Sequence, residues 1–123
     1  MKYLCMVCLD EKKLNALSES ESQTLDDESL AYDRTLQERG HLIAAQALES
    51  VQAATTVRFR GGKLSITDGP FAETTEQIGG FLLIEAKDLN EAIQLVSKVP
   101  VLRLGSIEVR PIKTLVSSNP EKD

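Results

Sequence analysis

Three segments of the chain are apolar at nearly every position, and they constrain its fold more than any other feature. They are KYLCMVCL at residues 2–9, HLIAAQAL at residues 41–48 and FLLIEA at residues 81–86. A strand with one wet face alternates apolar and polar side chains, whereas a strand covered on both faces is apolar throughout. We therefore expect three strands of one sheet, and we expect both faces of that sheet to be covered.

Two amphipathic segments predict helices. Residues 24–39 repeat apolar or small side chains at the helical period, and Gly40 follows where helices commonly end. Residues 88–99 show the same period and stop before Pro100. Residues 10–23 are polar and rich in serine, which predicts a loop or flap with at most one helical turn. The stripe of the first helix consists of Leu25, Ser29, Tyr32 and Leu36.

Three segments of alternating polarity predict a hairpin and a final strand. The segments TTVRFR at 55–60 and KLSITD at 63–68 flank Gly61-Gly62, a two-residue turn of the kind that hairpins prefer. The segment SIEVRPI at 106–112 also alternates, and its proline suits the edge of a sheet.

The order of these elements predicts an α+β fold of the ferredoxin-like βαββαβ type with an extra central hairpin. Two helices cover only one face of such a sheet, although the apolar strands require cover on both faces. We expect a second copy to supply it by sheet-on-sheet packing, giving an isologous homodimer with the interior of a dimeric α+β barrel. Residues 1–114 form the single domain in this prediction, and residues 115–123 form a flexible C-terminal tail.

Composition narrows the classes of partner. The net charge of −5 argues against nucleic acid, because an acidic chain repels phosphate backbones. One histidine and two cysteines are too few for a metal cage, so we expect no metal and no cofactor. No apolar run approaches the roughly 20 residues of a membrane span, and no signal-peptide pattern follows the start. We expect a soluble cytoplasmic protein without a membrane partner.

The segment Asp68-Gly69-Pro70-Phe71 has the composition of a rigid turn, and Glu73 follows it. Gly69 tolerates the geometry required before a proline, Pro70 fixes its own φ, and we expect Phe71 to anchor the loop in apolar surroundings. Two interpretations of Asp68 stay open. Its carboxylate either caps backbone amides of its own turn, or it is held at the mouth of a pocket as a general acid or base.

The segments TDGPFAET, EQIGGF and SIEVRP resemble the YCII-related proteins, specifically the subgroup named for its DGPF segment. The resemblance extends over most of the chain, from MKYLCMV to GSIEVRPI. It implies a ferredoxin-like subunit, a dimeric α+β barrel and a bacterial cytoplasmic protein, in a group whose members mostly have no assigned reaction.

The resemblance also implies candidate catalytic residues. In the broader family, a histidine on or after the first helix is suspected to pair with an aspartate. Asp68 is the candidate aspartate. His41 is the one histidine, but it opens the second strand beyond Gly40, so the family's position does not carry over to it. Tyr32, or a neighbour, is expected to face the pocket from the helix.

An arginine, two further acids and the pair of cysteines are additional candidates for chemistry. Arg110 is the candidate cation for an acidic substrate, since arginine binds a carboxylate through two parallel hydrogen bonds. Other acid candidates are Glu73 and Glu85. Cys5 and Cys8 form a C-x-x-C pattern, but in a strand their side chains point to opposite faces, so we expect two buried thiols and no disulfide.

Two functions from different classes follow. The first is a small-molecule enzyme that performs proton transfer, isomerisation or elimination on a small organic acid or carbonyl compound. In this enzyme Asp68 is the acid or base, and Gly69, Pro70 and Phe71 help to bind the ligand. The second is a non-catalytic module that binds a small ligand or a partner protein. RNA binding is disfavoured, because the chain is acidic and has only three Phe and two Tyr to stack on bases.

Overall fold

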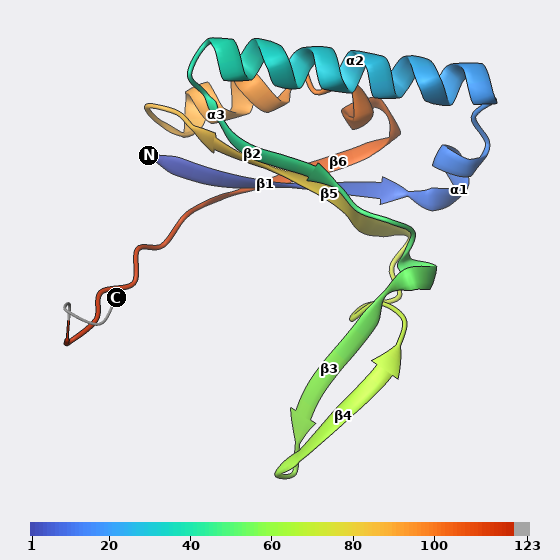
Figure 1. The fold of residues 1–123 in the computed structure, drawn as a ribbon, viewed down its shortest axis with the longest axis vertical. Coiled ribbons are helices and arrows are strands. Elements are labelled where there is room, and N and C mark those ends of the chain that lie inside the picture. The colour runs from blue at the N-terminus through green and yellow to red at the C-terminus, as the bar shows by residue number, and fades with distance from the viewer. Residues whose placement is uncertain (120–123) are drawn as a thin grey trace.

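The computed structural model describes residues 1–119, which form a mixed α+β fold built on a four-stranded antiparallel sheet (Figure 1). The strand order is β2-β5-β1-β6, with β1 in the interior of the sheet. These strands are β1 (Lys2–Asp10), β2 (Leu42–Ala47), β5 (Glu76–Glu85) and β6 (Gly105–Pro111). The arrangement is consistent with the expected ferredoxin-like type. Residues 120–123 of the predicted tail lie outside the described residues.

Helices accompany the sheet, and a separate pair of strands leaves it. The helices are α1 (Glu11–Asn15), α2 (Glu19–Glu38) and α3 (Leu89–Val96), with short 3-10 turns η1 (Val51–Ala53) and η2 (Pro100–Leu104). Within residues 1–119, the separate strands β3 (Thr55–Arg60) and β4 (Lys63–Asp68) pair only with each other. None of the helices in the described part of the chain has the length and apolar character needed to cross a membrane.

The core lies on the face of the sheet that α2 and α3 cover (Figure 1). Alternate residues of β1 are buried on this face, as a pleated strand requires. Leu36 of α2 and Leu95 of α3 belong to the same apolar cluster as Cys5 and Ile84. This packing confirms that the helices cover one face of the sheet.

The opposite face of the sheet, which we call the open face, is also apolar. Leu4, Met6 and Cys8 of β1 alternate with the buried residues and are only half-buried. Phe81 and Leu83 of β5 pair with Met6 and Leu4. Polar side chains border this face on β6, where Glu108 pairs with Met6 in the strand register.

The predicted loop at residues 10–23 is wrong over most of its length, because two helix caps organise it. Asp10 caps α1 by accepting a hydrogen bond from the Lys12 amide at 3.0 Å. Ser18 and Glu21 form a capping box: the Ser18 hydroxyl accepts from the Glu21 amide, and the Glu21 carboxylate accepts from the Ser18 amide. These bonds satisfy amides that a helix start otherwise leaves unpaired, so α2 begins at Glu19.

Strand β5 begins at Glu76, earlier than the predicted strand at 81–86, and it contains a bulge. Val7 pairs with Gly80 and Cys8 pairs with Ile78, so Gly79 is the extra residue. A Cβ atom at Gly80 would lie 2.9 Å from the Gln46 carbonyl oxygen of β2. The two glycines therefore allow a bulge and a close approach of two backbones.

We predict that truncation of Ile84 tests the location of the core. Ile84 is 0% exposed, and Ile84→Ala is expected to lower the free energy of unfolding by about 2–5 kcal/mol, because it leaves a cavity. Ile93 of α3 is 46% exposed, so Ile93→Ala should change stability by less than about 1 kcal/mol. Urea denaturation measures both values, and equal losses would contradict this assignment of the core.

Candidate functional site

A cavity of about 530 Å³ lies between α2 and the sheet. Its sheet wall consists of apolar side chains and backbone from the adjoining parts of β1, β2 and β5, and η2 closes one side with Val101. This volume is in the range of small-molecule sites, which are mostly apolar with a few polar groups that converge on the ligand. The cavity is therefore the candidate site.

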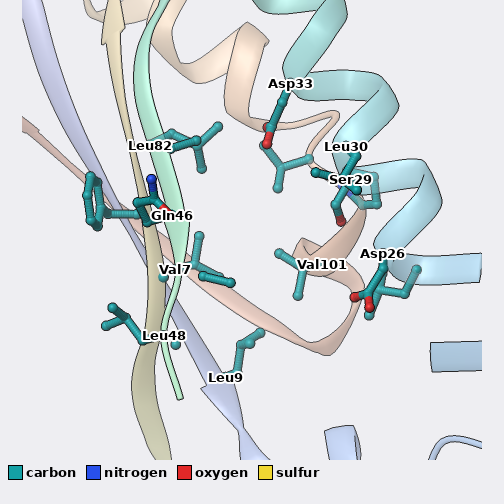
Figure 2. Close-up of a pocket in the computed structure, with 18 of the residues that line it drawn as sticks. Val7, Leu9, Asp26, Ser29, Leu30, Asp33, Gln46, Leu48, Leu82 and Val101 are labelled. Atoms are coloured by element: carbon teal, nitrogen blue, oxygen red, sulfur yellow. The ribbon is translucent and has the colours of Figure 1, made fainter. Parts of the chain in front are cut away.

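The polar groups of the cavity come mainly from one face of α2. Asp26, Ser29, Leu30 and Asp33 line it at intervals that place them along one side of a helix. Figure 2 shows Asp26, Ser29 and Asp33 on the α2 side, across the cavity from Val7 and Leu82 on the sheet side. The helix thus holds two carboxyl groups and one hydroxyl opposite an apolar wall.

The surroundings of Asp33 perturb its carboxyl group. Its side chain is half-buried, and burial raises the pKa of its carboxyl above the ordinary value. Among residues 1–119, no donor forms a hydrogen bond with this carboxylate. Removal from water without a compensating donor favours the neutral acid, which makes the ionised form a stronger base.

The cavity has a net acidic lining. Among the lining residues that the structure describes, Asp26 and Asp33 are the charged ones. No group of three or more potential metal ligands occurs in residues 1–119. The lining therefore favours neutral or cationic ligands over anionic ones, because carboxylates repel an anion.

Asp68 lies outside this cavity, at the end of β4, where it pairs with Thr55. Its side chain is exposed, and among the described residues it caps no amide of its own turn. The turn is held by Gly69, whose amide donates to the Ala54 carbonyl oxygen at 2.8 Å and whose carbonyl accepts from the Thr56 hydroxyl at 2.7 Å. Gly69 has a φ of 108°, which favours glycine.

The rest of this turn is also separate from the cavity. Pro70 is half-buried, and Glu73 is exposed. The expected apolar anchor at Phe71 is wrong, because its side chain is 76% exposed. Its ring lies 5.5 Å from the Arg58 guanidinium carbon, and the Arg58 guanidinium donates to the Phe71 carbonyl at 3.2 Å. The hairpin that precedes this turn extends away from the sheet (Figure 1).

His41 precedes β2, at the end of that strand remote from the cavity-lining residues 45–48. Its Nδ1 atom lies 2.8 Å from the Glu85 carbonyl oxygen. The Glu85 carboxylate forms an ion pair with the chain's amino terminus at 3.0 Å. His41 and Asp68 are thus on separate elements, and neither lines the cavity.

Tyr32 and Arg110 are engaged elsewhere in this chain. The Tyr32 hydroxyl donates to the Leu95 carbonyl at 2.5 Å, which joins α2 to α3. Burial raises the pKa of this phenol, and the Arg39 charge partly offsets the effect. Arg110 lies on β6 and forms an ion pair with Glu108.

The sequence prediction named neither Asp26 nor Asp33, although it placed Tyr32 or a neighbour at the pocket, and Asp33 is next to Tyr32. Both aspartates flank the predicted stripe of the first helix and are seven residues apart, which places them on one side of it. An acidic side chain next to an apolar stripe is usually solvated. Asp26 and Asp27 are both exposed, and only the place of Asp26 in the cavity lining distinguishes it from Asp27.

We predict that Asp33→Asn stabilises the fold at neutral pH. The folded state binds the Asp33 proton more tightly than the unfolded state, so the free energy of unfolding falls as pH rises between the two pKa values. The gain from Asp33→Asn should be complete above the folded-state pKa and vanish below about pH 4, the unfolded value. Urea denaturation at several pH values measures it, with exposed Asp27→Asn as the control. A loss of stability at pH 7 would contradict this account of Asp33.

Three comparisons place the chain among known proteins. An uncharacterized protein of Rhizobium meliloti (strain 1021) is 35% identical over 114 residues, which cover 91% of this chain and 92% of that protein. The structure of 5-chloro-2-hydroxyhydroquinone dehydrochlorinase from Burkholderia phenoliruptrix AC1100, in complex with 2,5-dihydroxybenzoquinone, is similar in fold. That match has a TM-score of 0.55 and 16% identity, and it covers 92% of this chain and 94% of the other. The model of the YCII-related domain matches residues 1–116, and the chain therefore belongs to the YCII-related family.

Proposed function

We propose that the protein is a small-molecule enzyme of the proton-transfer, isomerase or lyase type, with Asp33 as its acid/base group. The observation that carries this proposal is the half-buried Asp33 carboxyl, with its raised pKa, in the wall of an apolar cavity. Perturbed carboxyl groups in clefts are typical of acid/base sites. The similar fold of a dehydrochlorinase adds support, since removal of hydrogen chloride from a substrate takes a proton from it.

The proposed substrate is a small carbonyl compound rather than an organic acid. Asp26 and Asp33 would repel a carboxylate, and Arg110, the cation expected for one, forms an ion pair with Glu108 outside the cavity lining. A neutral ketone carries no such penalty, and its ring or chain fits an apolar wall.

The proposed step is transfer of a proton from the carbon next to the carbonyl. The C–H bond breaks, the Asp33 carboxylate takes the proton, and the electron pair moves to the carbonyl oxygen as an enolate. Ser29 lines the same cavity four residues before Asp33 on α2, and its hydroxyl would donate a hydrogen bond to that oxygen. Return of the proton to another atom gives isomerisation, and loss of a leaving group gives elimination.

We predict that the wild-type protein accelerates exchange of the α-protons of acetophenone or cyclohexanone with D₂O. Proton NMR measures the rate. Asp33→Asn should lower the catalysed rate by about 100-fold or more, which is typical for loss of a general base. Asp27→Asn on the same helix is the matched control and should retain it. In thermal-shift assays the ketones should stabilise the protein, and benzoate should not.

Each contrary result has a specific meaning. Proton exchange that persists in Asp33→Asn but is lost in Asp68→Asn would assign the acid/base role to Asp68 instead of Asp33. Stabilisation by the ketones without any exchange would support the non-catalytic binding module. Stronger stabilisation by benzoate than by acetophenone would contradict the proposed substrate class.

We further propose that a second copy covers the open face, as a homodimer by sheet-on-sheet packing. In support, Leu4, Met6 and Leu83 present apolar surface there. Glu108 and Arg110 on the bordering strand supply both signs of charge, as a self-complementary isologous contact needs.

We predict that Leu83→Glu shifts the protein from dimer to monomer, because it places a charge in the centre of this contact. Leu89→Glu, at an exposed position of α3, is the control and should leave the dimer intact. Sedimentation equilibrium measures the mass of both variants. A monomeric wild type, or a dimer in Leu83→Glu, would refute sheet-on-sheet packing.

Assignment to the DGPF subgroup and a location in the bacterial cytoplasm complete the proposal. The segment TDGPFAET at residues 67–74 supports the subgroup. The two cysteines are free thiols, which is typical of a reducing compartment.

A further inference from the structure

The hairpin of residues 55–68, which we call the arm, exposes an unusual amount of apolar surface. Val57 pairs with Ile66 and Phe59 pairs with Leu64 across the two strands, so the four side chains share one face. Each is between 60% and 73% exposed. A two-stranded hairpin is marginally stable in water by itself, so this face needs a partner surface.

Among residues 1–119, the hydrogen bonds of the arm's side chains stay within the arm and its root. Thr56 bonds to Gly69, and Arg58 bonds to Phe71. Figure 1 shows the arm extending away from the sheet, on the side opposite α2. The surface that covers the arm therefore belongs to another molecule, located on the same side as the open face.

Charge indicates which molecule this is. Arg60 and Lys63 face each other next to the turn, and like charges directly opposite destabilise a hairpin unless an acid neutralises them. The chain itself carries the complementary surface on α2, where one arginine stands among many acids. The acids of α2 are Glu19, Glu21, Asp26, Asp27, Glu28, Asp33 and Glu38. A basic arm and an acidic helix in one sequence fit two copies of the same chain.

The length of the arm fits this partner. Each arm strand has 6 residues, which span roughly 20 Å at about 3.3 Å per residue. Two sheets pack about 10 Å apart, and a helix layer adds about 10 Å more. An arm that starts at its own sheet and passes the sheet of a second copy therefore ends level with that copy's α2.

The arm also leaves the sheet at the corner where the cavity lies. Its root follows β2 and precedes β5, and the cavity is lined by residues 45–48 and 79–82 of the same region. In an isologous pair whose sheets cross at about a right angle, this corner of one copy lies against the same corner of the other. Each arm then rises beside the other copy's cavity.

We propose that the arm of a second copy packs along the cavity mouth and places Arg60 and Lys63 beside Asp26 of α2. The two cations from the partner then pair with Asp26 at the mouth, and Asp33 keeps the inner lining acidic. This inference rests on the proposed function and dimer. Arg60 and Lys63 alternate with Phe59 and Leu64 along the strands, so the polar face of the arm is the one that meets α2.

Mixed disulfide formation tests this placement. One protein sample carries Lys63→Cys and a mass tag, and the other carries Asp26→Cys. Both samples also carry Cys8→Ala, which removes the half-buried thiol. Cys5 stays in place, because it is buried and its pKa of about 11 keeps the thiol unreactive. After subunit exchange and mild oxidation, we expect the mixed disulfide to form at least about tenfold faster than with Gln94→Cys, an exposed position on α3. Equal rates for the two partners, or no disulfide with Asp26→Cys, would overturn the proposal.

A second measurement uses no new cysteine. Arg60→Ser with Lys63→Ser should raise the dimer dissociation constant about tenfold at low salt and less at high salt, because the lost contacts are surface ion pairs. Lys87→Ser is the control and should leave it unchanged. An unchanged constant in the double variant would contradict the ion pairs.

The outcomes separate this inference from the function on which it rests. A specific disulfide between the cysteines introduced at positions 63 and 26, together with normal proton exchange in Asp33→Asn, would support the arm contact and refute the acid/base role of Asp33. Loss of proton exchange in Asp33→Asn, with no such disulfide, would support the acid/base role of Asp33 and refute the contact between the arm and α2.

Discussion

The pairing of β1 with both of its neighbours is the interaction on which the rest of the structure depends. Hydrogen bonds to β5 and β6 run along nearly the whole strand, so the direction of every β1 side chain is fixed. The apolar sequence of β1 therefore supplies both the core under the helices and the open face. Because a one-residue slip would exchange these two faces, the register also determines where the cavity and the open face lie.

The sheet and its two main helices were predictable because their signals are local. Apolar runs give the strands, and the spacing of Leu25 and Leu36 gives the helix that covers them. The early start of α2 was missed because the capping box of Ser18 and Glu21 lies in a serine-rich stretch of low hydropathy. Such a segment has little apolar area to bury, and its caps decide its structure.

The candidate site was predictable only in part, because a site depends on contacts between distant segments. The aspartate in the DGPF turn is conspicuous in the sequence, but the arm carries Asp68 away from the apolar wall that would perturb it. Asp33 follows Tyr32 in the predicted helix, but nothing in the sequence sets it apart from the other acids of that segment. Only the structure shows that it lines a cavity together with Gly79 and Gly80 of β5.

Cys5 gives the central strand a chemical property that extends beyond packing. Its thiol is fully buried in the core, and burial raises its pKa to about 11. The reactive thiolate is therefore scarce while the sheet is closed. Alkylation of Cys5 has to wait until β1 separates from its neighbours, so its rate reports how often the centre of the sheet opens.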